Sequence, residues 1–235
     1  RDKKAIIESV LTVKKHLGHN SLTALINNAG IAILGPIEFL DPAVFQRQIE
    51  TNLIGTLNCT QAFLPLLKAK KNTTRPTNGR IINISSALGG KIGYPFYGAY
   101  CSSKHAIEGF SEALRRELTI HKVFVSIIAP GAIQTPIWDK AENDILINKY
   151  EGTVYESAYK KMVSDMKKLG ANGLQPETVA KKVIQAVETQ KPKLRYTFIN
   201  ELSLNLLYFA PRRLLDRLIT KYLGLTGKKI EKYFD

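Results

Sequence analysis

The chain has 235 residues, of which 44% are hydrophobic, and this is enough for one domain with a sizeable core. It holds no run of about 18 apolar residues, which argues against a membrane-spanning helix, and its charged start, RDKKAIIES, is unlike a signal peptide. The two cysteines lie in no metal-ligand spacing, so we expect no metal and a reduced, intracellular setting, cytoplasmic or at a membrane surface.

The first elements follow from hydrophobic spacing and end signals. Residues 3–17 carry apolar side chains at helical spacing and are followed by Gly18, which predicts a helix with a glycine stop. A buried strand is expected within 22–30. Asp41 and Pro42 then supply a cap and a first-turn proline for a long helix that reaches about residue 71.

The same alternation continues along the chain. We expect strands at 80–86, 123–131 and 194–199, and helices at 97–120 and 176–189. Residues 136–172 predict a mixture of loop and helix, and residues 201–235 an amphipathic helical tail. Strands separated by helices require crossover connections, so the sequence predicts an α/β fold with a parallel sheet, in one domain spanning 1–235.

Three segments that follow predicted strands are rich in small residues and in amide or hydroxyl groups. They are NNAG at 27–30, SSALGG at 85–90 and APGAIQT at 129–135. Ligands of parallel sheets bind beyond the carboxyl ends of the strands, and small residues let a ligand approach the backbone. We therefore expect a binding crevice at this edge.

The stretch GYPFYGAYCSSK, residues 93–104, holds three tyrosines, and Tyr100 alone has a lysine, Lys104, four residues later. Residues four apart lie on one face of a helix. A free tyrosine has a pKa near 10, and a nearby ammonium favours the phenolate. The pair is therefore the minimum for a tyrosine acid/base, although this spacing by itself is common.

Two neighbouring features strengthen this interpretation. Ser85 and Ser86 end a predicted strand at the sheet edge where the tyrosine helix begins, so a serine hydroxyl could bind the same substrate oxygen. Asn52 lies in the middle of a predicted helix, where asparagine is a mediocre helix former. Taken separately, Ser86 could be a helix-entry cap and Asn52 a polar surface position. Their joint occurrence favours an active site.

Five motifs together resemble those of short-chain dehydrogenases/reductases, of the type similar to retinol, hydroxysteroid and hydroxybutyrate dehydrogenases. They are NNAG (27–30), NLIG (52–55), GRIINISS (79–86), YCSSK (100–104) and PGAIQT (130–135), and the likeness extends over essentially the whole chain. The resemblance implies a Rossmann-like, doubly wound parallel sheet. It also implies an NAD- or NADP-dependent oxidoreductase that interconverts a hydrophobic secondary alcohol and its ketone.

The resemblance also implies roles for individual residues. Tyr100 would be the acid/base, Lys104 would lower its pKa and bind the nicotinamide ribose, Ser86 would orient the substrate oxygen, and Asn52 would hold a relay water. The residues expected to bind the cofactor, besides Tyr100 and Lys104, are Asn28, Ala29, Gly30, Pro130, Gly131, Ile133 and Thr135. Those expected to line the substrate pocket are Ser86, Tyr94, Tyr97 and Trp138.

Two departures from the family pattern matter. The glycine-rich TGxxxGxG turn that receives the pyrophosphate is absent from the sequence, so we expect an N-terminal βαβ portion to be missing. The piece alone should then bind NAD(P) poorly, expose a sheet edge, and lack the residue that separates NAD from NADP. In addition, Ser86 precedes Tyr100 by fourteen positions where thirteen or fewer is usual, so Ser85 remains a reserve for the serine role.

Several alternatives stay open. The same fold could serve as a non-catalytic binding or scaffolding protein.

Residues 136–172 should fold over a lipophilic substrate, because they are rich in apolar and aromatic groups. The net charge of the chain is +14, and residues 191–235 hold ten basic and four acidic side chains. This tail could pack over the pocket or on a second subunit of a homo-oligomer, or it could dock on an anionic membrane surface; nucleic acid is not expected.

Overall fold

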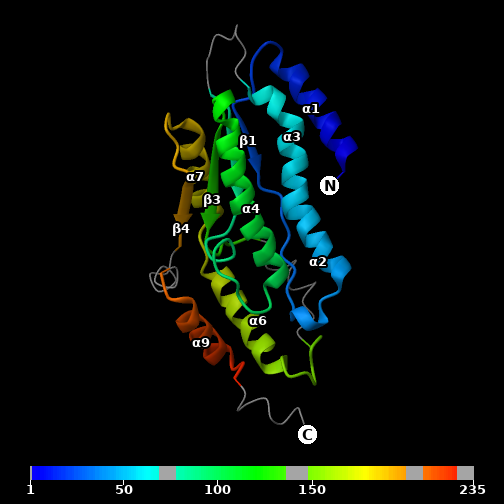
Figure 1. Ribbon diagram of the computed structural model, residues 1–235, viewed down its shortest axis with the longest axis vertical. Coiled ribbons are helices and arrows are strands. Elements are labelled where there is room, and N and C mark those ends of the chain that lie inside the picture. The colour runs from blue at the N-terminus through cyan, green and yellow to red at the C-terminus, as the bar shows by residue number, and fades with distance from the viewer. Residues whose placement is uncertain (1, 69–77, 136–147, 200–208, 227–235) are drawn as a thin grey trace.

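The computed structural model describes residues 2–68, 78–135, 148–199 and 209–226. Four parallel strands form one sheet between helical layers (Figure 1). In order across the sheet, the strands are β1 (Ala24–Asn27), β2 (Arg80–Ile84), β3 (Phe124–Pro130) and β4 (Arg195–Phe198). The predicted α/β class with a parallel sheet is confirmed.

The helices come in the predicted order. Their bounds are α1 (Lys3–Leu17), α2 (Pro42–Ile49), the π-helical turn η2 (Glu50–Ile54), α3 (Gly55–Leu67), α4 (Gly98–Glu117), α6 (Glu156–Ala171), α7 (Pro176–Glu188) and α9 (Arg212–Leu223), with short 3-10 turns η1 (Ile37–Phe39) and η3 (Leu118–His121). The predicted cap at Asp41 is confirmed, because its side chain accepts the Ala43 N–H at 2.8 Å. The helix expected from 41 to 71 is instead interrupted by η2 and ends at Leu67.

Successive residues of β2 point to opposite helical layers. Ile81 packs with Leu67 of α3 and Leu114 of α4. Ile82 packs on the other face with Ala186 of α7. Both isoleucines are fully buried, as a strand covered on two faces requires. The described elements therefore form a helix–sheet–helix sandwich.

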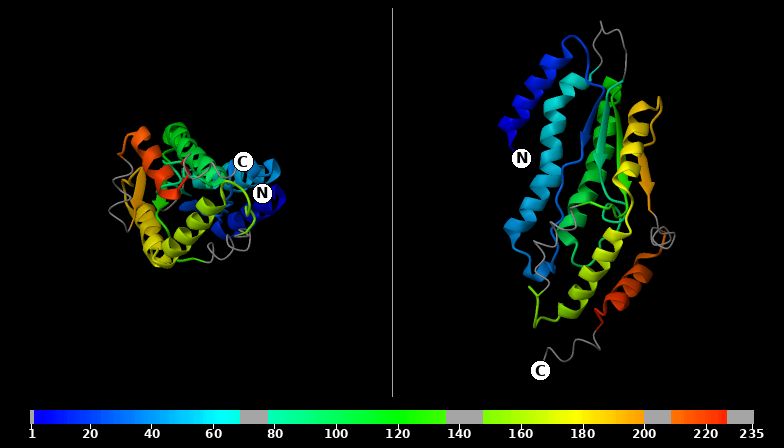
Figure 2. Two further views of the ribbon diagram at one scale, coloured as in Figure 1. Left: turned by 90° about the horizontal axis from the view of Figure 1, so that it is seen from below. Right: turned by 180° about the vertical axis from the view of Figure 1, so that it is seen from behind.

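A third apolar cluster lies beyond the carboxyl ends of the strands. The strand arrows point toward α6 and α9, which pack side by side (Figures 1 and 2). The buried members of this cluster are Leu34, Phe96, Tyr150, Ala158, Tyr159, Met162, Val163, Met166 and Leu223. The tail helix α9 is thus part of the covering of this end of the sheet. None of the helices within the described ranges combines the length and apolar character needed to cross a membrane.

Candidate active site

The parallel register brings the three small-residue segments to one edge of the sheet. Asn27 of β1 lies opposite Asn83 of β2, and Ile84 lies opposite Ile128 of β3. The segments NNAG, SSALGG and PGAIQT therefore all leave the sheet at its carboxyl edge. This is the edge at which parallel sheets bind ligands.

Helix α4 places Tyr100 and Lys104 at this edge. The residue before its cap, Phe96, has a left-handed φ of 69° and is buried, so the chain turns sharply into the helix. Lys104 is only 7% exposed, and its ammonium donates to the Ile84 carbonyl at 2.8 Å. The same ammonium lies 5.8 Å from the centre of the Tyr100 ring. The predicted pair is therefore together, at the end of β2.

Burial opposes the charged form of both groups. It lowers the pKa of Lys104 to about 8, although the Glu108 carboxylate works in the other direction. It raises the pKa of Tyr100 to about 12, although a hydrogen bond with the Ser86 side chain works in the other direction. Near neutral pH the site thus holds a protonated phenol beside an ammonium. A protonated phenol is the form that can give a proton to a carbonyl oxygen.

The two candidate serines have different surroundings. Ser86 shares a hydrogen bond with Tyr100, and its hydroxyl accepts the Gly89 N–H at 3.1 Å. Ser85 is only 3% exposed, and its hydroxyl donates to Glu108 at 2.6 Å. Contact with the tyrosine therefore favours Ser86 for the substrate role, and Ser85 has a different partner.

Asn52 lies in the π-helical turn η2 and is almost fully buried. Its oxygen accepts the Ile31 N–H at 2.9 Å, while its amide donates to the Ile31 carbonyl at 3.1 Å and to the Ser103 hydroxyl at 2.9 Å. Asn52 therefore ties the segment after β1 to α4, next to Lys104. Its role in holding a water stays a prediction.

The other two tyrosines extend from Tyr100 as a chain of edge-to-face rings. The ring centres are 6.3 Å apart between Tyr100 and Tyr97, and 5.8 Å apart between Tyr97 and Tyr94. Burial raises the pKa of Tyr97, and it raises that of Tyr94 to about 12. Both pack against the apolar cluster beyond the strands. Trp138, the fourth predicted substrate residue, lies outside the described residues.

The predicted cofactor residues occupy two of the strand ends. Asn28, Ala29 and Gly30 are exposed directly after β1. Pro130 is the last residue of β3, and the segment from Gly131 to Thr135 follows it. Its backbone is fixed by the hydrogen bond from the Gly131 N–H to the Phe198 carbonyl, and by pairing of Ile133 with Leu174.

These residues suit a dinucleotide, and the part of it that each of them binds stays a prediction. They combine an exposed small-residue backbone after β1 with the Lys104 ammonium and an ordered turn after β3, all at one sheet edge. Within the described ranges, no group of three or more His, Cys, Asp or Glu side chains could hold a metal ion.

Two residues at this site were not among those predicted. Glu108 lies one turn beyond Lys104 on α4, and Arg195 of β4 forms an ion pair with it at 3.0 Å. The spacing of four residues from Tyr100 to Lys104 and from Lys104 to Glu108 was the available signal for Glu108. Arg195 gives no such signal, because its partner is 87 residues away in the chain.

The chain is similar to known proteins over most of its length. The family model described as short chain dehydrogenase matches residues 1–146. An NADPH-dependent 3-dehydrocapnine reductase of Ornithobacterium rhinotracheale is 36% identical over 94% of this chain and 77% of its own length. Retinol dehydrogenase 16 of Mus musculus is 33% identical over 70% of this chain and 53% of its own length.

Solved structures show the same fold. A short-chain dehydrogenase from Streptomyces avermitilis superposes with a TM-score of 0.67, at 24% identity, over 95% of this chain and 76% of that one. A metagenomic short-chain oxidoreductase in complex with NADP gives a TM-score of 0.58, at 26% identity, over 85% of this chain and 71% of that one. The predicted Rossmann-like fold is confirmed. Among the curated relatives matched, several are covered over less than two thirds of their length, including the retinol dehydrogenase at 53%.

Proposed function

This chain belongs to the short chain dehydrogenase family, a family of NAD(P)-dependent oxidoreductases, and from that premise we propose that it interconverts a hydrophobic secondary alcohol and its ketone. The resemblance seen in the sequence motifs is confirmed at the level of the family. The observation that carries the proposal is the cluster that brings the Tyr100 ring, the Ser86 hydroxyl and the buried Lys104 ammonium together at one sheet edge.

Each residue has a role that its surroundings support. In ketone reduction, the Tyr100 phenol donates its proton to the carbonyl oxygen while the Ser86 hydroxyl donates a hydrogen bond to the same oxygen. The Lys104 ammonium then stabilises the phenolate that remains. Bound NAD(P)H supplies the hydride that the carbonyl carbon receives. In alcohol oxidation each of these steps runs in reverse.

The substrate proposal draws on the cluster beyond the strand ends. Tyr94 and Tyr97 lead from Tyr100 into an apolar group that includes Phe96, Tyr150 and Tyr159. Such surroundings suit a retinoid, steroid or lipid-like ketone better than a sugar or an amino acid. The relatives include proteins named retinol dehydrogenase and 17-beta-hydroxysteroid dehydrogenase, which supports this substrate class.

A series of hydroxyl deletions tests the assignment in the full-length protein. We expect Tyr100→Phe to reduce kcat about 10²–10⁴-fold, because the proton donor is lost while the ring is kept. Ser86→Ala should reduce kcat about 10²-fold, as for loss of one donor to a developing oxyanion. Tyr222→Phe, which removes a hydroxyl from an exposed ring on α9, is the matched control and should leave kcat nearly unchanged.

Ser85→Ala should cost less activity than Ser86→Ala, because the Ser85 hydroxyl is directed to Glu108. The reverse ranking would transfer the serine role to Ser85. Wild-type turnover by Tyr100→Phe would refute the tyrosine mechanism. The remaining explanations would then be a mechanism that does not use the tyrosine, or a binding function on the same fold.

We also propose that the tail touches an anionic membrane surface, while the protein assembles as a homo-oligomer. Helix α9 is fixed to the protein by buried Leu215 and Leu223, but it exposes Leu214 and Leu218 together with basic side chains at 212, 213, 217 and 221. Basic and apolar groups on one exposed helix suit interfacial docking. Co-sedimentation with phosphatidylserine vesicles at low salt should detect it, and absence of co-sedimentation would contradict it.

A further inference from the structure

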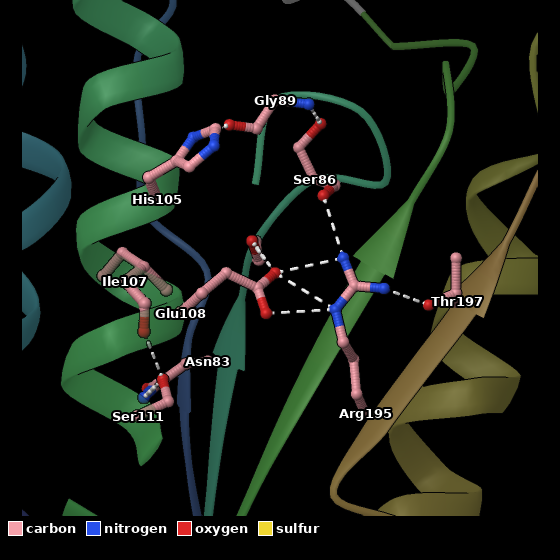
Figure 3. Close-up of polar contacts among 10 residues, drawn as sticks. Asn83, Ser86, Gly89, His105, Ile107, Glu108, Ser111, Arg195 and Thr197 are labelled. Atoms are coloured by element: carbon pink, nitrogen blue, oxygen red, sulfur yellow. Dashed lines mark hydrogen bonds and ion pairs between the residues drawn. The ribbon is translucent and has the colours of Figure 1, made fainter. Parts of the chain in front are cut away.

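A partly buried ion pair joins the active-site helix to the last strand of the sheet. The Arg195 Nε lies 3.0 Å from one Glu108 carboxylate oxygen, and its Nη2 lies 3.1 Å from the other (Figure 3). The two side chains are only 18% and 15% exposed. Two parallel hydrogen bonds between a guanidinium and a carboxylate fix the orientation of both groups.

Each member of the pair also holds the chain just after β2. Glu108 accepts the Ser85 hydroxyl at 2.6 Å, and Arg195 Nη2 donates to the Ser86 backbone carbonyl at 3.3 Å. Arg195 also donates to the Thr197 hydroxyl on its own strand (Figure 3). The guanidinium therefore connects β4 directly to the backbone of the proposed substrate-orienting serine.

The loop after Ser86 fits closely around the same pair. A Cβ at Gly90 would meet the Ser85 hydroxyl at 2.5 Å and the Glu108 carboxylate at 2.6 Å, so the site has no room for a side chain. His105 fixes the neighbouring turn, with its Nδ1 2.9 Å from the Gly89 carbonyl (Figure 3). The loop is thus held from α4 and from β4.

The pair also sets charge near the acid/base. Tyr100, Lys104 and Glu108 follow one another at four-residue spacing on α4, and the Glu108 carboxylate favours the ammonium form of Lys104. Besides Glu108, the titratable groups here are Tyr100 and Cys101 on α4 and Tyr97 at its cap, and Arg195 reaches the site from β4. From β2 and η2 come neutral groups, the Ile84 carbonyl and the Asn52 amide.

We propose that Glu108 and Arg195 are positioning residues that hold Ser86 in register with Tyr100 and balance the charge around Lys104. This proposal rests on the proposed function, because it concerns the same reaction. It differs from a purely structural ion pair in one respect: removing either charge must change the electrostatics of the acid/base, and the two removals must act in opposite directions.

The pH dependence of ketone reduction by the full-length protein supplies that readout. Glu108→Gln removes a negative charge, so a proton leaves the Tyr100–Lys104 pair more easily and the alkaline limb of kcat should move to lower pH. Arg195→Met removes a positive charge, so the limb should move to higher pH. We expect each shift to be about one pH unit, opposite in sign. The double variant should return the limb toward its wild-type position.

Turnover reports the positioning part of the proposal. Both single variants should lower kcat about tenfold to a hundredfold, since small displacements of a catalytic group are costly, and the double variant should cost no more than the worse single variant. Arg195→Lys keeps the positive charge but loses the two parallel hydrogen bonds of the guanidinium. It should therefore leave the alkaline limb of kcat at its wild-type pH and still lower kcat. Glu112→Gln, which breaks the exposed pair with Arg116 on the same helix, is the control and should change neither quantity.

The outcomes separate this proposal from the proposed function. Wild-type kcat and an unmoved limb in Glu108→Gln and Arg195→Met, with Tyr100→Phe inactive, would overturn the positioning role alone. Shifts of the same sign in both variants would likewise overturn it. Unimpaired turnover by Tyr100→Phe would instead overturn the proposed function. If Arg195→Met does not fold, Glu108→Gln alone tests the shift of the limb, and Arg195→Lys tests the loss of kcat; an unmoved limb in the first with wild-type kcat in the second would overturn the positioning role.

Discussion

At the scale of single residues, the chemistry depends on burying a lysine. Lys104 is 7% exposed. Its ammonium donates a hydrogen bond to the Ile84 carbonyl and is attracted electrostatically by the Glu108 carboxylate. Burial lowers its pKa from 10.5 to about 8, which means that the ammonium form is less stable in the folded protein than in the unfolded chain. The residue therefore costs stability at neutral pH while it serves the site.

This cost leads to a prediction about stability and pH. Between pH 8 and 10.5 the unfolded chain binds the Lys104 proton and the folded protein does not, so this group makes stability rise with pH across that window. Lys104→Met lacks the effect. Its free energy of unfolding relative to wild type should fall by about 3 kcal/mol between pH 7 and pH 10.5, measured by denaturant unfolding.

The control is Lys181→Met on the exposed side of α7, whose difference from wild type should stay constant with pH. A constant difference for Lys104→Met as well would mean that the lysine is not desolvated in the folded protein.

Single residues also mark what the sequence could predict. Tyr100 and Lys104 were predictable, because four residues on a helix fix their proximity. The choice between Ser85 and Ser86 was not, because both end the same strand and only their tertiary partners, Glu108 and Tyr100, distinguish them. Arg195 could not be foreseen for the same reason.

At the scale of elements, local signals placed most helices correctly. Helix α1 stops at Gly18 and α7 begins at Pro176, as the sequence indicates, whereas the Asp2 cap of α1 was not predicted. The exception is the helix expected to run from 41 to 71. A π-helical turn, η2, interrupts it at Glu50–Ile54 and brings Asn52 into the interior. Such a turn depends on tertiary partners, which hydrophobic spacing does not show.

The contacts of Asn52 make η2 testable. We expect Asn52→Ala to lower the free energy of unfolding by about 1–3 kcal/mol, because the Ile31 N–H and carbonyl lose a buried partner. Gln46→Ala, at an exposed position one and a half turns earlier, should change it by less than about 0.5 kcal/mol. Equal losses in thermal or denaturant unfolding would show that η2 is not fastened by this side chain.

At the scale of the whole molecule, the carboxyl edge of the sheet and its lateral side at β1 have different surroundings. The carboxyl edge carries the proposed chemistry and is covered by α6 and α9 (Figure 2). At the side of the sheet, β1 pairs only with β2 among the described strands, and Ile26 is 44% exposed.

The most direct test of the central claim follows deuterium from 4,4-dideuterated NADPH or NADH into a hydrophobic ketone, using the full-length protein. We predict that the wild type yields an alcohol with deuterium on the carbinol carbon, detected by mass spectrometry. Tyr100→Phe, which keeps the ring, should still bind the cofactor and yield almost no deuterated alcohol. A wild-type protein that binds either cofactor yet transfers no deuterium to retinoid, steroid or fatty ketones would contradict the account, as would undiminished transfer by Tyr100→Phe.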